Sequence, residues 1–192
     1  IVSSDRGSRG RNYDEPESAA LLGDAAAAVL VEKALDDEES CMLDFTMNTY
    51  PEGSHLTEVK GGGTNLHPHD SKTKFADNLF TMNGPMIYKM ARKTVYNQIQ
   101  LDLKNNNLKA DDIDLVLPHQ ASGLAIKAYS KYGGFSIDKV VNILDKTGNC
   151  VAASLPLALA IAYEDNRIKR GDLIYFIGTG AGLSVASCLI KF

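Results

Sequence analysis

Two polar side chains follow apolar runs that have the composition of buried strands. His119 is separated from the run 113–117 only by Pro118, and Asn149 comes shortly after the run 140–144. The carboxyl ends of strands in open α/β sheets are where ligands bind, so both side chains are candidates for a polar site. A histidine is a common acid–base group, and a carboxamide can donate a hydrogen bond to an oxygen that gains negative charge. Each also has an ordinary explanation, as a core or capping histidine and as a helix-capping or turn asparagine.

A glycine-rich segment, Gly178-Thr179-Gly180-Ala181-Gly182, separates the last two apolar runs. Glycine lets the backbone approach a ligand closely, which makes this segment a further candidate. A hairpin connection between two buried strands is the alternative. A phosphate-binding loop is disfavoured, because the Gly-Lys-Ser/Thr ending and the following helix are both missing.

Cysteine and histidine residues do not form a metal or redox motif. Cys41, Cys150 and Cys188 are widely spaced, and no Cys-x-x-Cys pair exists. None of the three has the cationic or helix N-terminal surroundings of an activated thiol, although Cys150 lies close to Asn149 and is the weak candidate for a nucleophile. The run His67-Pro68-His69-Asp70 is better explained as a solvated loop than as a metal site, because no further ligand is identifiable.

From residue 85 onward, helical and strand patterns alternate. Apolar residues at helical spacing predict a helix over 85–104, and short apolar runs predict buried strands. The full order is α-β-α-β-α-β-β, which predicts a layered α/β fold. The remaining expected elements are helices over 122–132 and 152–166 and strands over 140–144, 173–177 and 183–190.

The segment 1–81 is less regular. Residues 5–18 are expected to be an exposed loop, residues 19–31 a buried strand pair rather than a helix, and residues 42–50 an edge strand. Residues 51–74 are rich in glycine and histidine and predict a long irregular segment, which is usually functional or mobile. Ile1 and Val2 have the character of a strand end, which suggests a fragment, a processed chain or an isolated domain.

The composition excludes several classes of protein. A net charge of −4 does not indicate general nucleic-acid binding. No apolar run approaches the roughly 20 residues of a membrane helix, and the first residues lack the features of a signal peptide. Three scattered cysteines fit a reducing compartment, so a cytoplasmic location is expected.

Three motifs in a fixed order resemble one known family. Pro-His-Gln-Ala follows a strand, Gly-Asn precedes the helix that begins near residue 152, and a glycine loop precedes the last strand. Together they resemble the β-ketoacyl-acyl-carrier-protein (ACP) synthase III family of the thiolase superfamily. The segments 23–27, 82–84 and 167–173 are also similar to family motifs. The resemblance is strong over 82–192, fair over 1–31 and poor over 32–81.

The resemblance implies a thiolase-like layered fold of two similar halves. Residues 1–50 would be the tail of the N-terminal half, 51–81 an irregular connecting segment, and 82–192 a complete C-terminal half. The family's reactive cysteine lies in the N-terminal half, so this chain would contain no nucleophile. It would be inactive without that half, and the whole protein would be a homodimer.

The resemblance also implies a reaction, the decarboxylative condensation of an acyl thioester with malonyl-ACP in fatty-acid or polyketide-type synthesis. His119 and Asn149 would hold the malonyl thioester oxygen, and the backbone at Gly180 and Ala181 would contribute to a second oxyanion site. No metal or other cofactor is implied, with acyl-CoA and malonyl-ACP as substrates. Lys89 and Lys131 match basic positions that could face the acidic carrier.

Some positions depart from the family pattern and leave alternatives open. Thr179 stands where relatives commonly have phenylalanine, and Ser122-Gly123-Leu124 stands where they often have asparagine and then arginine. An acyltransferase or a non-decarboxylating condensing enzyme on the same fold is therefore an alternative. A non-catalytic partner or truncated subunit is another.

Overall fold

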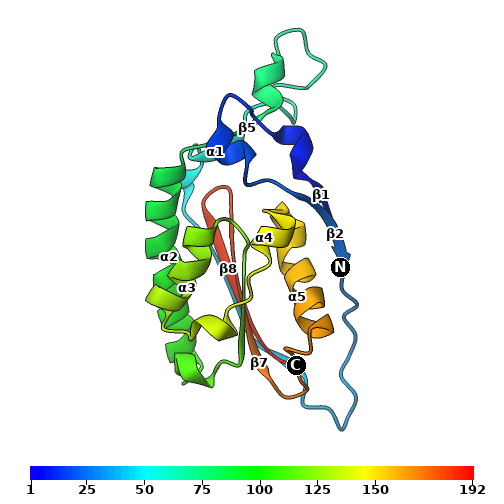
Figure 1. The fold of residues 1–192 in the computed structure, drawn as a ribbon, viewed down its shortest axis with the longest axis vertical. Coiled ribbons are helices and arrows are strands. Elements are labelled where there is room, and N and C mark those ends of the chain that lie inside the picture. Colours follow the sequence, from blue (N-terminus) through cyan, green and yellow to red (C-terminus); the bar gives the residue numbers. More distant parts are fainter.

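The computed structural model describes all residues from 1 to 192, and a four-stranded mixed sheet lies at its centre. The strand order is β3-β8-β7-β6, in which β6 and β7 are parallel and the other neighbours are antiparallel. Helices α2 and α3 cover one face of the sheet and α5 covers part of the other (Figure 1). These elements are β3 (Cys41–Thr49), α2 (Gly84–Asn105), β6 (Leu115–Pro118), α3 (Gly123–Gly133), α5 (Ser154–Glu164), β7 (Leu173–Gly180) and β8 (Ser184–Lys191).

Strand β6 is buried along its whole length because its side chains supply two hydrophobic cores. Val116 packs with residues of α2 and α3, whereas Leu115 and Leu117 pack with residues of α5. A strand covered on both faces is expected to be continuously apolar, as this one is. The layered α/β arrangement predicted from the alternating patterns is therefore confirmed.

Local capping groups mark the starts of α2 and α3 and the end of α3. Asn83 accepts a hydrogen bond from the Met86 amide (3.2 Å) at the start of α2, and Ser122 accepts one from the Ala125 amide (3.2 Å) at the start of α3. Gly134 ends α3 with φ = +82°, a left-handed conformation that suits glycine. No helix combines the length and the apolar character needed to cross a membrane.

Residues 1–28 form a small unit of their own. Strands β1 (Val2–Arg6) and β2 (Asp24–Ala28) pair antiparallel, and the short helix α1 (Pro16–Ala19) lies between them in the sequence. The prediction of a buried strand pair over 19–31 is wrong, because β2 alternates between exposed and half-buried residues. The expected exposed loop over 5–18 also contains part of β1 and most of α1.

Strand β3 is an edge strand, as predicted, and it pairs with β8 from Cys41↔Lys191 to Thr49↔Ser184. This pairing joins residues 41–49 to the same sheet as β6, β7 and β8. A strand can pair across a boundary between two halves, so the predicted boundary at residue 50 stays a prediction. Pairing with the last strand of the chain cannot be read from the local pattern of residues 41–49.

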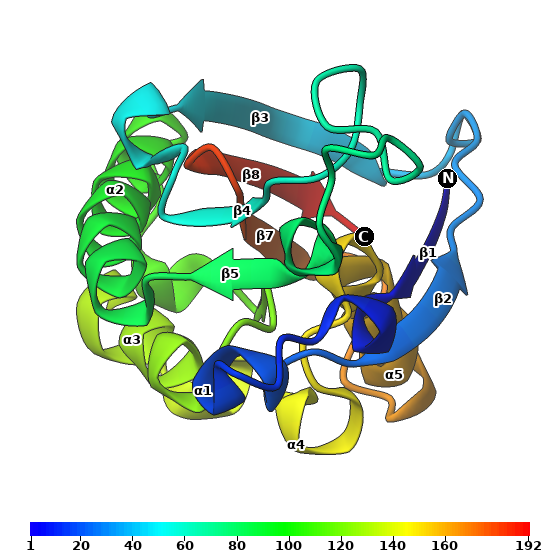
Figure 2. The same cartoon turned by 90° about the horizontal axis from the view of Figure 1, so that it is seen from above.

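Residues 51–82 lie beyond one end of the main sheet. Strands β4 (Thr57–Val59) and β5 (Phe80–Met82) form a two-stranded sheet there, close to the N-terminal unit (Figures 1 and 2). The stretch between them is irregular, as expected from its composition. Short 3-10 helices lie at Gly7–Gly10, Pro51–Gly53, Phe75–Asn78, Ala110–Asp112, Ile137–Lys139 and Val151–Ala153.

The expected strand over 140–144 is reduced to a single bridge. Val140 pairs with Val116, and the Val141 amide donates to the Val116 carbonyl (2.9 Å). The ladder ends there, and helix α4 (Leu144–Thr147) follows. The prediction of a regular strand over 140–144 is therefore wrong, although the segment does lie beside β6.

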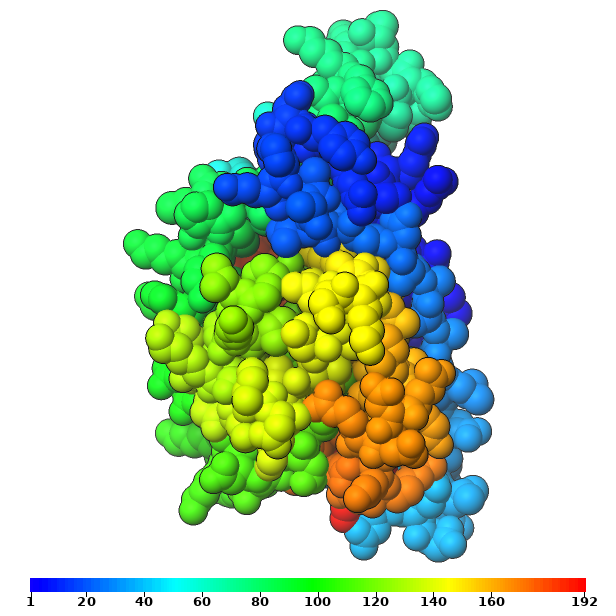
Figure 3. All heavy atoms as spheres, in the orientation of Figure 1, coloured from blue at the N-terminus to red at the C-terminus, as the bar shows by residue number.

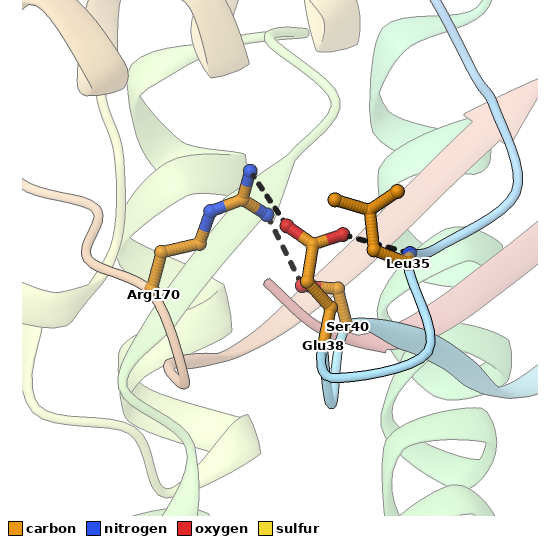
Figure 4. A network of polar contacts seen from close by, with 4 residues as sticks. All are labelled: Leu35, Glu38, Ser40 and Arg170. Atoms are coloured by element: carbon orange, nitrogen blue, oxygen red, sulfur yellow. Dashed lines mark hydrogen bonds and ion pairs between the residues drawn. The ribbon is translucent and has the colours of Figure 1, made fainter.

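The connection between β2 and β3 is tied to the end of the main sheet by polar contacts. Arg170 donates to the Ser40 hydroxyl (3.1 Å) and lies 3.7 Å from the Glu38 carboxylate, which in turn accepts from the Leu35 amide (3.1 Å; Figure 4). Lys191 and Glu39 form a further ion pair. Exposed pairs of this kind contribute about 0–1 kcal/mol each, so they add little to the stability of the fold.

A buried polar chain connects α2 to the sheet. The Asp102 carboxylate accepts hydrogen bonds from the Tyr175 hydroxyl (2.6 Å) and from the side-chain NH₂ group of Gln98 (2.7 Å). The side-chain oxygen of Gln98 accepts one from the side-chain NH₂ group of Asn48 (2.7 Å). Burial raises the pKa of Tyr175, so its hydroxyl remains a donor at neutral pH.

Replacing Asp102 by leucine is expected to lower the free energy of unfolding by about 3–5 kcal/mol. The hydrogen bonds to Asp102 would be lost. The Tyr175 hydroxyl and the side-chain NH₂ group of Gln98 would then be buried without an acceptor, and each unsatisfied donor costs about 1–3 kcal/mol of stability. Urea denaturation measures the effect. Asp102→Asn is the control, because it keeps one acceptor and should lose less; equal stability of Asp102→Leu and wild type would contradict the role of the network.

Candidate active site

One large cavity brings together the candidate residues from distant parts of the sequence. It has a volume of about 1040 Å³, and its lining includes His119, Asn149, Thr179, Gly180 and Ala181. The rest of the lining comes mainly from α2, α3, the β4–β5 pair and residues 5–22, and it is largely apolar. In Figure 3, red atoms of the last hairpin are visible in a gap between the blue N-terminal residues and the green and yellow segments. The side chains predicted to share a pocket therefore do share one.

His119 is placed by the end of β6. Its amide donates to the Ile177 carbonyl on β7 (2.8 Å), which continues the parallel ladder by one residue beyond Pro118. The imidazole makes no hydrogen bond to another group of the chain, and it lines the cavity. Burial lowers the pKa of His119 to about 4. The ring is therefore neutral at pH 7 and has one N–H group to donate.

The lowered pKa of His119 predicts a loss of stability in acid. The unfolded chain takes up this proton near pH 6.5 and the folded chain only near pH 4. Between these values the unfolded state binds more protons, so the free energy of unfolding falls as the pH falls, and the cost is complete below pH 4. The expected size is about 1–3 kcal/mol.

Urea titrations at pH 7 and pH 4 measure this effect against a His119→Gln variant, which removes the titrating ring. The wild type should lose more stability than the variant over that interval, since carboxylate protonation affects both equally. Parallel losses would show that His119 titrates normally.

Asn149 is held by the N-terminal unit. Its amide donates to the Leu21 carbonyl (2.7 Å), and its carbonyl accepts from the Gly23 amide (2.9 Å). Its side-chain oxygen accepts from the Val151 amide (2.9 Å), whereas its side-chain NH₂ group has no acceptor within the chain. The backbone of Asn149 is thus fixed on both sides, and its NH₂ group is left free as a donor.

Close packing explains the glycine at position 23. A Cβ atom at Gly23 would lie only 1.9 Å from the Thr147 carbonyl oxygen, and the neighbouring Cys150 sulfur would be 3.1 Å away. Gly148, at φ = +68°, completes the turn that precedes Asn149. Sequence reasoning did not identify Gly23 as a residue that positions Asn149, because this contact joins segments that lie far apart in the sequence.

The glycine loop is the hairpin that connects β7 with β8, and its last pair is Gly180↔Ser184. Both Gly180 and Ala181 are exposed to the cavity. The Ala181 amide has no hydrogen-bond acceptor within the chain. The segment is therefore a hairpin, which was one of the two alternatives, and its tip lines the cavity, whereas contact with a ligand stays a prediction.

The two predicted docking lysines lie outside the cavity. Lys89 and Lys131 are exposed on α2 and α3, and neither belongs to the lining. Arg92, which sequence reasoning missed, does line the cavity, and its guanidinium lies 5.3 Å from the centre of the Tyr132 ring. The Lys131 ammonium lies 5.4 Å from the same ring.

The three cysteines are unpaired, and two of them are at least partly buried. Burial raises the pKa of Cys150, and its thiol donates to the Thr147 carbonyl (3.2 Å). Burial also raises the pKa of Cys188, and Cys41 is exposed on the edge strand. The His67 and His69 rings are 5.5 Å apart, but no group of three or more His, Cys, Asp or Glu side chains could hold a metal ion.

The fold and the site together define a class of protein. A mixed sheet between helical layers, with His119 and Asn149 lining one cavity, has the features that the resemblance to thiolase-like condensing enzymes implies for a C-terminal half. The glycine hairpin beside these two residues belongs to the same arrangement.

Comparisons with known proteins specify the class further. The family model described as 3-oxoacyl-[acyl-carrier-protein (ACP)] synthase III C terminal matches residues 103–192, and the one described as 3-oxoacyl-[acyl-carrier-protein (ACP)] synthase III matches residues 1–51. The β-ketoacyl-[acyl-carrier-protein] synthase III of Aliarcobacter butzleri is 32% identical over 192 residues, which are 100% of this chain and 57% of that protein. The corresponding protein of Clostridioides difficile is 33% identical over 194 residues, with 100% and 58% covered.

Solved structures give the same result. The crystal structure of 3-oxoacyl-[acyl-carrier-protein] synthase III from Aquifex aeolicus is similar with a TM-score of 0.86 and 26% identity, and 100% of this chain and 57% of that one are covered. The chain belongs to the 3-oxoacyl-ACP synthase III family of the thiolase superfamily. It spans somewhat more than half the length of the curated relatives that it matches.

Proposed function

We propose that this chain supplies the enolate-stabilising part of a decarboxylating condensing enzyme. The observation that supports the proposal is the shared cavity of His119 and Asn149, each with an N–H donor that no group of the chain accepts. A neutral imidazole N–H and a carboxamide N–H can both point at one thioester carbonyl oxygen. Fixed donors in a largely apolar cavity stabilise developing negative charge better than water does.

The proposed reaction begins with a malonyl thioester. The bond between its carboxylate carbon and C2 breaks, carbon dioxide leaves, and the electron pair forms an enolate whose oxygen His119 and Asn149 hold. The C2 atom of the enolate attacks the carbonyl carbon of an acyl group on a cysteine of the N-terminal half. The tetrahedral oxyanion that forms is held in part by the Ala181 amide beside Gly180, and the cysteine thiolate then leaves. No metal or organic cofactor is needed, because decarboxylation generates the nucleophile.

The proposed substrates are acyl-CoA and malonyl-ACP, and relatives bear the name of ACP synthases. Lys89 and Lys131, exposed on α2 and α3, would attract an acidic carrier. Exposed charges are screened over about 8 Å at physiological salt, so carrier binding should weaken as the salt concentration rises. A homodimer in the cytoplasm is the proposed state of the whole protein.

The test is product analysis with the whole protein. Acyl-CoA and malonyl-ACP should give a 3-oxoacyl product by mass spectrometry, with one carbon dioxide released for each chain extension. Condensation without release of carbon dioxide, or transfer of the acyl group alone, would support the non-decarboxylating alternative that Thr179 suggested. Absence of any thioester turnover in the presence of the cysteine-bearing half would support a non-catalytic subunit.

A further inference from the structure

Gln120, next to His119, is completely buried and uses its whole side chain in hydrogen bonds. Its NH₂ group donates to the Pro118 carbonyl (2.9 Å) and to the Val141 carbonyl (3.2 Å). Its side-chain oxygen accepts from the Ile143 amide (3.0 Å). Two of the three bonds therefore connect the exit of β6 with the neighbouring segment 141–143.

These bonds take the place of a missing part of the sheet. Backbone pairing between β6 and its neighbour ends after the bridge Val116↔Val140 and the bond from the Val141 amide to the Val116 carbonyl. Beyond that point the Val141 carbonyl and the Ile143 amide would be buried without partners. The carboxamide of Gln120 has the same donor and acceptor as a peptide group, and it satisfies both.

The two segments that Gln120 joins lead to the two donors of the cavity. On one side Gln120 is the residue after His119. On the other, Ile143 leads through the single helical turn of α4 to Asn149. Gln120 therefore bonds the segment that ends at His119 to the segment that leads to Asn149.

We propose that Gln120 is a positioning residue that fixes the relative positions of His119 and Asn149 at one end of the cavity. The importance of these positions for catalysis rests on the proposed function, but the hydrogen bonds of Gln120 do not. Donors aimed at one oxygen must be held by groups whose own rotamers are locked, and Gln120 is locked by three bonds.

A buried residue can contribute stability without positioning anything, and Gln98 provides the matched control. It is also a buried glutamine, and its carboxamide is bonded at both ends, to Asp102 and to Asn48. It lies on α2 and does not line the cavity. Replacing either glutamine by methionine removes a carboxamide of the same kind and keeps the length of the side chain.

The experiment compares Gln120→Met and Gln98→Met in this chain, with ¹⁵N-detected NMR of the histidine rings. The signals that are missing in His119→Gln identify the His119 ring, whose midpoint is expected near pH 4. In Gln120→Met the His119 signals should shift or broaden, and its midpoint should rise by half a pH unit or more. In Gln98→Met they should stay as in wild type, although unfolding by urea shows a similar loss of stability. Unchanged His119 signals in folded Gln120→Met would overturn the proposal.

Gln120→Glu covers the case in which Gln120→Met does not fold. A buried, protonated glutamic acid keeps an acceptor for the Ile143 amide and one donor, so the His119 signals should lie between those of wild type and a free ring. Wild-type signals in this variant, despite the lost donor, would count against positioning.

Kinetics of the whole protein provide a second readout. Gln120→Met should lower kcat for malonyl thioester decarboxylation by about 10–100-fold while KM changes less than about threefold, as for an interaction made in the transition state. Equal losses in kcat for Gln98→Met and Gln120→Met would show that Gln120 contributes to stability alone and does not position the donors. If wild type shows no decarboxylation, the proposed function fails, and the NMR comparison still decides the role of Gln120.

Discussion

His119→Ala should lower the rate of malonyl thioester decarboxylation by the whole protein about 10²–10³-fold, the usual effect of removing one oxyanion donor. The imidazole is neutral at pH 7 because burial lowers its pKa to about 4, so it acts as an N–H donor and not as a cation. The loss should appear mainly in kcat, since the thioester oxygen becomes charged only as carbon dioxide leaves. Release of carbon dioxide from malonyl-ACP measures it directly.

Two further variants separate the loss of a donor from a change in the shape of the cavity. His119→Gln keeps an N–H donor at this position and should retain more activity than His119→Ala. Asn149→Ala should cause a loss of similar size, and the double variant should lose less than the product of the two single losses, because both donors serve one oxygen. Decarboxylation at the wild-type rate in His119→Ala would remove His119 from the mechanism.

The second large effect is expected at Gly23. Gly23→Ala should lower the free energy of unfolding by about 3 kcal/mol or more, in the range of severe overpacking. The added Cβ would lie 1.9 Å from the Thr147 carbonyl oxygen, a backbone atom that cannot move without displacing the turn before Asn149. The two backbone hydrogen bonds of Asn149 with Leu21 and Gly23 should weaken as a result.

Urea denaturation measures this effect, and Gly10→Ala is its control. Gly10 also lines the cavity from the N-terminal unit, but a Cβ atom there would meet nothing within 4 Å. Gly10→Ala should therefore be nearly neutral. If both variants have the stability of wild type, the N-terminal unit does not pack against the Asn149 turn as described.

The N-terminal unit therefore has a role that exceeds its small size. Its few buried side chains, such as Ala19 and Leu22, contribute little to the two main cores. It holds the backbone of Asn149 through Leu21 and Gly23, and Asp5 accepts a hydrogen bond from the Ala153 amide (3.1 Å) at the start of the next helical segment. A residue of the second half is thus positioned by the segment that opens the chain.

Local patterns were enough to predict the three longest helices, α2, α3 and α5, and the continuous strands. The apolar periodicity of α2 and its capping residue Asn83 are contiguous in the sequence, and so are α3 and the glycine that ends it. Such signals can be read without knowledge of the fold. Strand β6 was recognised because a strand covered on both faces is apolar throughout. The family motifs around His119 and Asn149 are also short and contiguous, so the candidate site could be named from them.

Pairing between distant segments decided the rest. The sheet to which Cys41–Thr49 belongs depends on hydrogen bonds to β8, and the exposure of β2 depends on what covers it. The predicted strand at 140–144 is replaced by one bridge because the Gln120 side chain satisfies peptide groups that a neighbouring strand would have satisfied. Sequence alone thus determined which residue types could do the chemistry and which elements precede them. Only the tertiary structure could bring His119 and Asn149 into one cavity, because side-chain bonds and close backbone contacts between segments far apart in the sequence leave no local pattern.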